Sequence, residues 1–253
     1  MLNKITLCTV FVLFVANPLQ AELRFTMRTE AREVESPQPP NPILAKFGEM
    51  LAKAIAPDGV TQATFLVGEN RARIELGSAV RGLQKGTVIL RQPDGFIFAL
   101  NANDRTYQKM VTPEFRTNSL MTTNSKVSSV RSGEFVTISG IRSERVTLVI
   151  SFDFTAEASR LPPGFPSTWT IDWDMWVTDR FKMPSSLVAI VNPAMQALGL
   201  EKYLQDEFVM RQIIRSPLLG GYEMESVIVN ISEEPAAPEL FAIPSDYTPA
   251  SGR

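Results

Sequence analysis

The sequence predicts a mainly β protein with a few helices (α+β). We expect a single half-open antiparallel β-barrel or curved sheet, with helices covering its concave face. Many short segments alternate apolar and polar residues with a period of two, as half-buried strands do. Turn-forming residues separate these segments, and helical spacing is confined to a few places. Hydrophobic residues make up 44% of the 253 residues, enough to form a core.

The two clearest strand patterns lie in the second half of the chain. In residues 144–154 one face carries only apolar residues, namely Val146, Leu148, Ile150, Phe152 and Phe154. In the next strand Trp169, Ile171, Trp173, Met175 and Val177 share a face. Pro93-Asp94-Gly95 predicts a hairpin turn. Further strands are expected at 23–28, 63–67, 71–76, 87–91, 96–100, 105–110, 134–141 and 221–232.

Three helices are expected. Asn41-Pro42 is a typical start for the first, over residues 43–55. Its residues at helical spacing are Ile43, Phe47, Met50 or Leu51, and Ala54. The second begins at Ser185 or Ser186, and the third runs over residues 201–214. We expect the first helix, and the last two as a pair, to lie against the concave face of the sheet.

Residues 1–21 have the pattern of a cleavable secretory signal. Lys4 precedes an apolar run over residues 5–15, which is too short to span a bilayer, and the small residue Ala21 ends the segment. We expect cleavage after Ala21 and a periplasmic mature protein without a transmembrane segment. Its domain organisation would be a single β domain over 22–247, followed by a disordered tail over 248–253.

Missing residue types exclude much chemistry. The chain has no histidine, and its single cysteine, Cys8, lies inside the predicted signal. Catalytic triads that use histidine, and histidine or cysteine metal sites, are therefore excluded. We find no glycine-rich phosphate loop, and the formal net charge of −2 does not favour nucleic acid. We expect no catalytic residue, no metal, no cofactor and no nucleic-acid partner.

Asp172 and Asp174 are the one carboxylate pair that we tested as a catalytic site. Two residues apart on a predicted strand, they point to the same face, about 7 Å apart. A retaining glycosidase needs two carboxyl groups at about 5–5.5 Å. The alternative is that they belong to a solvated face, opposite the tryptophans, and we favour it because paired catalytic acids usually come from different elements.

The tryptophan-bearing face has two interpretations that the sequence leaves open. Large aromatic side chains dominate ordinary packed cores. They also line the apolar cavities of partly open β-barrels. On the second interpretation the ligand-binding residues are Leu148, Ile150, Phe152, Trp169 and Trp173.

Several motifs resemble an uncharacterised family of exported domains. They are the run Thr137-Ile-Ser-Gly-Ile-Arg-Ser-Glu-Arg145, the segment Trp176-Val-Thr-Asp179, and a closing stretch formed by residues 225–235 and by Glu239-Leu-Phe-Ala-Ile-Pro-Ser-Asp-Tyr247. Ser143 stands where that family usually has a cysteine. The family is similar in architecture to the outer-membrane lipoprotein carrier (LolA-like) superfamily, whose half-open barrel accepts acyl chains under a cover of helices. The resemblance spans about residues 60–247.

The functional expectation combines the exclusions with this resemblance. It is a non-enzymatic periplasmic protein that binds a lipid, an acyl chain or another apolar ligand in a half-barrel cavity. One alternative is an envelope interaction or sensor protein that uses the barrel as a scaffold and binds an envelope protein partner. A carboxylate-dependent hydrolase is the third.

Overall fold

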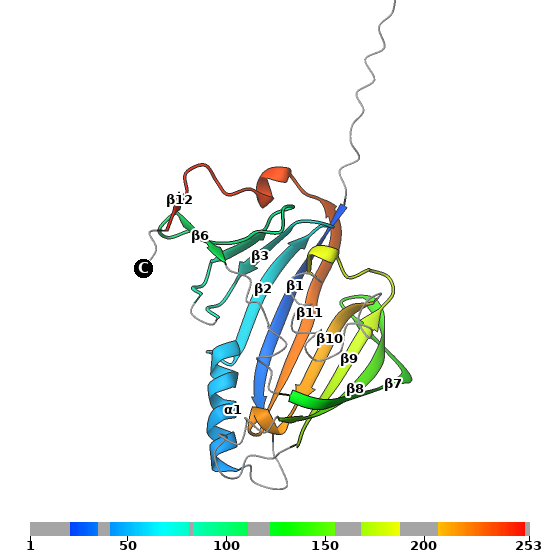
Figure 1. The fold of residues 1–253 in the computed structure, drawn as a ribbon. Helices are drawn as coiled ribbons and strands as arrows, with labels where there is room; N and C mark the ends of the chain where they lie inside the picture. The colour runs from blue at the N-terminus through cyan, green and yellow to red at the C-terminus, as the bar shows by residue number, and fades with distance from the viewer. Residues whose placement is uncertain are drawn as a thin grey trace, which may run out of the picture.

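The computed structural model describes residues 21–34, 41–80, 83–110, 122–154, 168–187 and 207–250. Within these residues twelve strands form one mostly antiparallel open sheet, so the mainly β fold class is confirmed. The strand order is β12-β6-β5-β4-β3-β2-β1-β11-β10-β9-β8-β7. β1 therefore joins the early strands to the late ones, between β2 and β11, and Figure 1 shows these three side by side.

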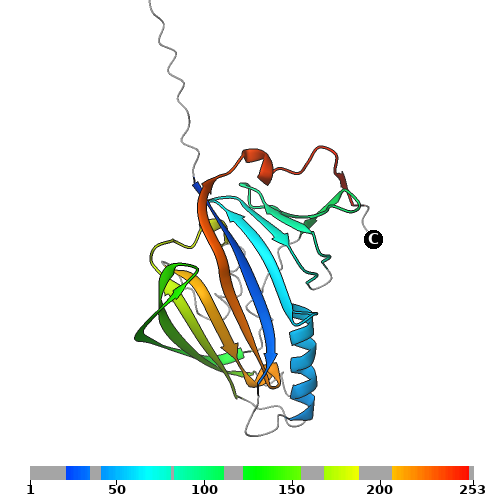
Figure 2. The same ribbon diagram turned by 180° about the vertical axis from the view of Figure 1, so that it is seen from behind.

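The strands differ strongly in length. The long ones are β1 (Ala21–Glu33), β7 (Thr122–Ile138), β8 (Ile141–Phe154), β9 (Thr168–Thr178) and β11 (Tyr222–Pro235). The shorter ones are β2 (Val60–Val67), β3 (Ala72–Leu76), β4 (Val88–Arg91), β5 (Ile97–Asn101), β6 (Thr106–Met110), β10 (Phe208–Arg215) and β12 (Thr248–Pro249). Figures 1 and 2 show that the short strands β3 to β6 fan out from the long ones at one end of the sheet.

The hairpin between β4 and β5 forms where Pro93-Asp94-Gly95 predicted it, whereas the turn between β7 and β8 lies inside the strand expected over residues 134–141. Between β4 and β5, Gly95 has a φ of 87°, and the Gln92 amide donates to the Phe96 carbonyl at 2.9 Å. Between β7 and β8, Ser139 and Gly140 have φ values of 49° and 79°, the pair of positive values that a tight two-residue hairpin turn requires. The Ser139 hydroxyl donates to the Ile228 carbonyl at 2.7 Å, so the tip of this hairpin contacts β11.

The first helix, α1 (Pro42–Ile55), begins as predicted, because the Asn41 side chain accepts a hydrogen bond from the Ile43 amide at 2.9 Å. Its buried side differs from the prediction. Ile43 is 42% exposed, and the buried residues are instead Leu44, Gly48 and Ala52. The 3₁₀ turn η4 (Pro217–Leu219) packs so closely that a Cβ at Gly48 would lie 2.1 Å from the Leu219 carbonyl oxygen. Only a residue without a side chain fits at this position, so α1 packs against η4 through the side that carries Gly48.

The helix predicted over 201–214 is wrong in its second half. Residues 208–215 form β10, which pairs with β9 and β11. The apolar residues of this segment have a spacing that suits a helix, but three of them, Val209, Ile213 and Ile214, are β-branched and favour a strand. The second helix begins near the expected place, because Ser185–Leu187 is helical. Residues 188–206 lie outside the described part of the chain.

The last strand of the described residues lies at one edge of the sheet. Thr248 and Pro249 pair in parallel with Thr106 and Tyr107, where we expected a disordered tail to begin. A second 3₁₀ turn, η5 (Pro238–Phe241), connects β11 to this last strand. Residues 1–20 of the predicted signal lie outside the described residues. Among the helices of the described residues, none is both long and apolar enough to cross a membrane.

Candidate functional site

Strand β9 separates two chemically different faces of the sheet. We call one the apolar face, defined by the cross-strand pairs Val146–Met175, Leu148–Trp173, Ile150–Ile171 and Phe152–Trp169 of β8 and β9. We call the other the charged face, defined by the alternate residues Arg145, Asp174, Arg215, Glu223 and Arg32 of neighbouring strands. Because successive side chains of a strand point to opposite sides of the sheet, β9 contributes residues to both faces.

The five residues predicted to bind a ligand all lie on the apolar face. Leu148, Ile150 and Trp169 are fully buried, and Phe152 is 5% exposed. These four form one packed cluster with Met175, Val177 and Leu44 of α1. Trp173 packs against the cluster but is only partly buried.

A cavity of about 230 Å³ lies beside this cluster, and of the five predicted residues only Trp173 lines it. Most of its other lining residues are apolar, and they come from β1, β2, β10, β11 and the segment that follows β9. They are Met27, Phe65, Met183, Leu187, Phe208, Val209, Met210, Val227 and Ile228, with Arg211, Gln212 and Ser226 as the polar members. Sequence reasoning missed most of these residues, because they belong to strands far apart in the chain.

The polar side chains of this cavity are already hydrogen-bonded. The Trp173 indole nitrogen donates to the Gln212 side-chain oxygen at 3.1 Å. The hydroxyls of Ser226 and Thr29 are 2.9 Å apart. The Arg211 guanidinium donates to Glu225 at 2.7 Å. The cavity therefore presents mainly apolar surface to whatever enters it.

One side of the cavity is anchored by two serines at the start of the second helix. The Ser186 hydroxyl donates to the Gly68 carbonyl at 2.6 Å, and the Ser185 hydroxyl donates to the Glu69 carbonyl. Ser186 is fully buried. These bonds tie Leu187, which lines the cavity, to the turn between β2 and β3.

The charged face carries a continuous ladder of ion pairs, which we call the arginine ladder. Arg32 on β1 contacts Glu223 on β11 at 2.9 Å, and Glu223 also accepts from Arg215 on β10 at 3.0 Å. Arg215 contacts Asp174 on β9 at 2.9 Å, and Asp174 contacts Arg145 on β8 at 3.0 Å. The ladder thus crosses the sheet from β1 to β8.

Asp174 corrects the prediction of a solvated acidic face. Asp172 is exposed, as expected, but Asp174 is only 5% exposed. Burial alone would raise the pKa of Asp174, but hydrogen bonds from Thr147, Arg215 and Arg145 outweigh it and hold the pKa below its usual value. A carboxylate stabilised in its ionised form is poorly suited to the general-acid role that a glycosidase needs.

No known family model matches this chain, and no curated protein matches it. The motif resemblance to the exported domain family therefore stays a prediction. Among solved structures, the chain is similar to a LolA superfamily protein of Nitrosomonas europaea. That match has 6% sequence identity and a TM-score of 0.34, and it covers 88% of this chain and 90% of the other.

Proposed function

We propose that this protein is a non-enzymatic binder of a lipid, an acyl chain or a similar apolar ligand, which enters the cavity beside Trp173. The observation that carries the proposal is the cavity itself, at about 230 Å³ with a predominantly apolar lining. Apolar pockets with a few polar groups are the usual form of small-molecule sites. The volume is below the roughly 300–1,000 Å³ of drug-sized pockets, so we infer that a single chain enters rather than a bulky ring system.

The lining suits a flexible ligand. Three of its residues are methionines, Met27, Met183 and Met210. Unbranched thioether side chains adapt to irregular apolar shapes more easily than branched ones do. Burial of the ligand would supply the driving force, at about 0.8 kcal/mol for each methylene removed from water.

In this proposal the five predicted residues have two roles. Trp173 contacts the ligand directly. Leu148, Ile150, Phe152 and Trp169 form the packed wall that holds Trp173 in place, since Leu148 is its cross-strand partner. We further propose that the protein acts in the periplasm, after removal of residues 1–21.

A pair of matched methionine variants tests the proposal. Binding of palmitic acid to the purified full chain is measured by displacement of a fluorescent fatty acid. Met183→Asp places a charge in the cavity lining and is expected to weaken binding at least tenfold, because a buried unpaired charge is costly. Met50→Asp makes the same change on α1, at a residue that is 57% exposed, and should leave binding unchanged.

Two results would contradict the proposal. The first is equal palmitate affinity of the two variants. The second is a wild-type protein that binds no fatty acid and crosslinks to an envelope protein instead, which would support the scaffold alternative.

A further inference from the structure

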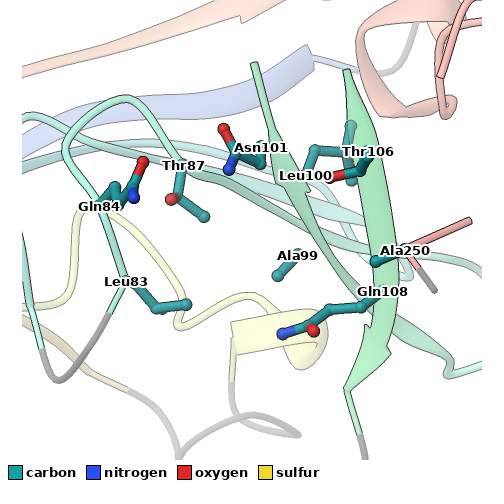
Figure 3. A pocket seen from close by; sticks show the side chains of 9 residues that line it. All are labelled: Leu83, Gln84, Thr87, Ala99, Leu100, Asn101, Thr106, Gln108 and Ala250. Atoms are coloured by element: carbon teal, nitrogen blue, oxygen red, sulfur yellow. The ribbon is translucent and has the colours of Figure 1, made fainter. Parts of the chain in front are cut away.

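A second cavity, of about 180 Å³, lies among the short strands at the other end of the sheet. Among the described residues, none lines both this cavity and the cavity beside Trp173, which we call the apolar cavity. Five of its lining side chains are polar and uncharged, and they come from β5, β6 and the turn before β4, as Figure 3 shows: Gln84, Thr87, Asn101, Thr106 and Gln108. None of the described residues that line it is acidic or basic.

Thr87 is the most buried of the polar residues that line this cavity. Thr87 is only 6% exposed, and it lines the cavity. Figure 3 shows its side chain pointing into the space bordered by Leu83, Ala99 and Gln108. A threonine hydroxyl donates one hydrogen bond and accepts others, so Thr87 can bond to a ligand in this cavity.

Two of the amides are held in position by a hydrogen-bond network outside the cavity. Asn101 donates to the Asp104 carboxylate at 2.8 Å and accepts from the Asn103 amide at 2.9 Å. The Asn103 side chain in turn donates to the Gln84 side-chain oxygen at 3.4 Å. Each primary amide has two donors and one acceptor oxygen, so both retain hydrogen-bonding capacity for a ligand. The two hydrogen bonds of Asn101 orient its side chain before a ligand arrives.

The lining also defines the charge and size of the ligand. Among the described residues of the lining, a charged group would find no opposite charge to pair with, so the lining favours a neutral ligand. The cavity has room for about six water molecules at their liquid volume of about 30 Å³ each. Amides and hydroxyls can both donate and accept hydrogen bonds. They therefore suit a ligand whose own groups also donate and accept, as hydroxyl groups do.

We propose that this cavity binds a small neutral ligand rich in hydroxyl groups, of the size of one sugar ring. The hydroxyls of the ring bond to Thr87, Gln108 and the amides. Its carbon-bound hydrogens lie against the apolar part of the lining, at Leu83 and Ala99. This site goes beyond the proposed apolar function and does not depend on it.

The test is an NMR titration of the full chain with glucose, galactose and mannose, with glucuronic acid as the charged comparison. We expect at least one neutral hexose to bind with a Kd on the order of millimolar, as a fragment-sized ligand does. Thr87→Val removes a hydroxyl from the lining, and Gln108→Leu removes an exposed amide whose loss does not threaten folding. Each is expected to weaken binding at least about fivefold, the equivalent of one hydrogen bond.

Two controls keep the result specific. Thr64→Val removes a hydroxyl from β2, outside this cavity, and Met183→Asp alters only the apolar cavity, so both should bind the hexose as the wild type does. The proposal is overturned if no neutral hexose binds, if glucuronic acid binds as tightly, or if Gln108→Leu binds like the wild type.

Discussion

The two faces of β9 are stabilised in opposite ways, although the same strand forms both. On the apolar face Trp169 and Met175 are fully buried among other apolar side chains. On the charged face Asp174 is nearly as buried, but it is held by two arginines and a threonine. The first face gains its stability from the removal of apolar area from water, and the second from the pairing of charges that would otherwise be unfavourable to bury.

Replacement of Trp169 by alanine should have the largest effect on folding. The side chain is fully buried, so its loss removes apolar contacts and leaves a cavity. We expect the free energy of unfolding to fall by about 3–5 kcal/mol, measured by urea denaturation. Val149→Ala, at a residue of β8 that is 36% exposed on the charged face, should cost less than about 1 kcal/mol. Equal losses in the two variants would show that the apolar cluster does not dominate stability.

Loss of the Asp174 carboxylate should have the next largest effect. Asp174→Ala leaves Arg145 and Arg215 without this partner, and we expect a loss of about 1.5–3 kcal/mol, as for hydrogen bonds to charged groups. Asp172→Ala is the matched control on the same face of the same strand, and should change stability by less than about 0.5 kcal/mol. If the control proves as destabilising as Asp174→Ala, the arginine ladder has no special role.

Acid should weaken the charged face selectively. The pKa of Asp174 is lowered in the folded protein, so its contribution to stability is fully present above the pKa of the unfolded chain, about 3.9. That contribution is lost as the pH falls through the lower pKa of the folded state. Below about pH 4 the wild type should therefore lose stability more steeply than Asp174→Asn does, as measured by urea denaturation at several pH values. Parallel curves would contradict the role assigned to this carboxylate.

The smallest effect on stability is expected at the edge of the apolar face. Trp173→Phe keeps a ring in the cavity lining but removes the indole donor to Gln212. We expect a loss of about 0.5–1.5 kcal/mol in thermal or urea unfolding, the usual net value of one hydrogen bond. A loss as large as that of Trp169→Ala would place Trp173 inside the core rather than at the cavity.

The apolar face could be predicted from the sequence because its signal is local. Alternation in β8 and β9 identifies which residues share a face, and turn residues such as Asp94 and Gly95 locate the hairpins. The same reasoning failed at β10, because its apolar residues have a helical spacing. This segment is nevertheless a strand, since it pairs with β9 on one side and β11 on the other.

The arginine ladder and the cavity beside Trp173 could not be predicted, because both depend on the order of the strands in the sheet. Arg32 and Glu223 are 191 residues apart in the sequence and meet only because β1 pairs with β11. Likewise Met27, Trp173 and Met183 meet at the cavity through the order of the strands. A single sequence identifies the face of each strand but not the strand that lies beside it.

The most direct test of apolar ligand binding is a chain-length series. The dissociation constants of hexanoic, octanoic, decanoic, dodecanoic and palmitic acid are measured on the full chain by isothermal titration. If the cavity beside Trp173 takes up the chain, each added methylene should lower Kd about fourfold, the equivalent of about 0.8 kcal/mol, until the cavity is full and Kd levels off. Dissociation constants that do not depend on chain length, or the absence of binding across the series, would contradict the account.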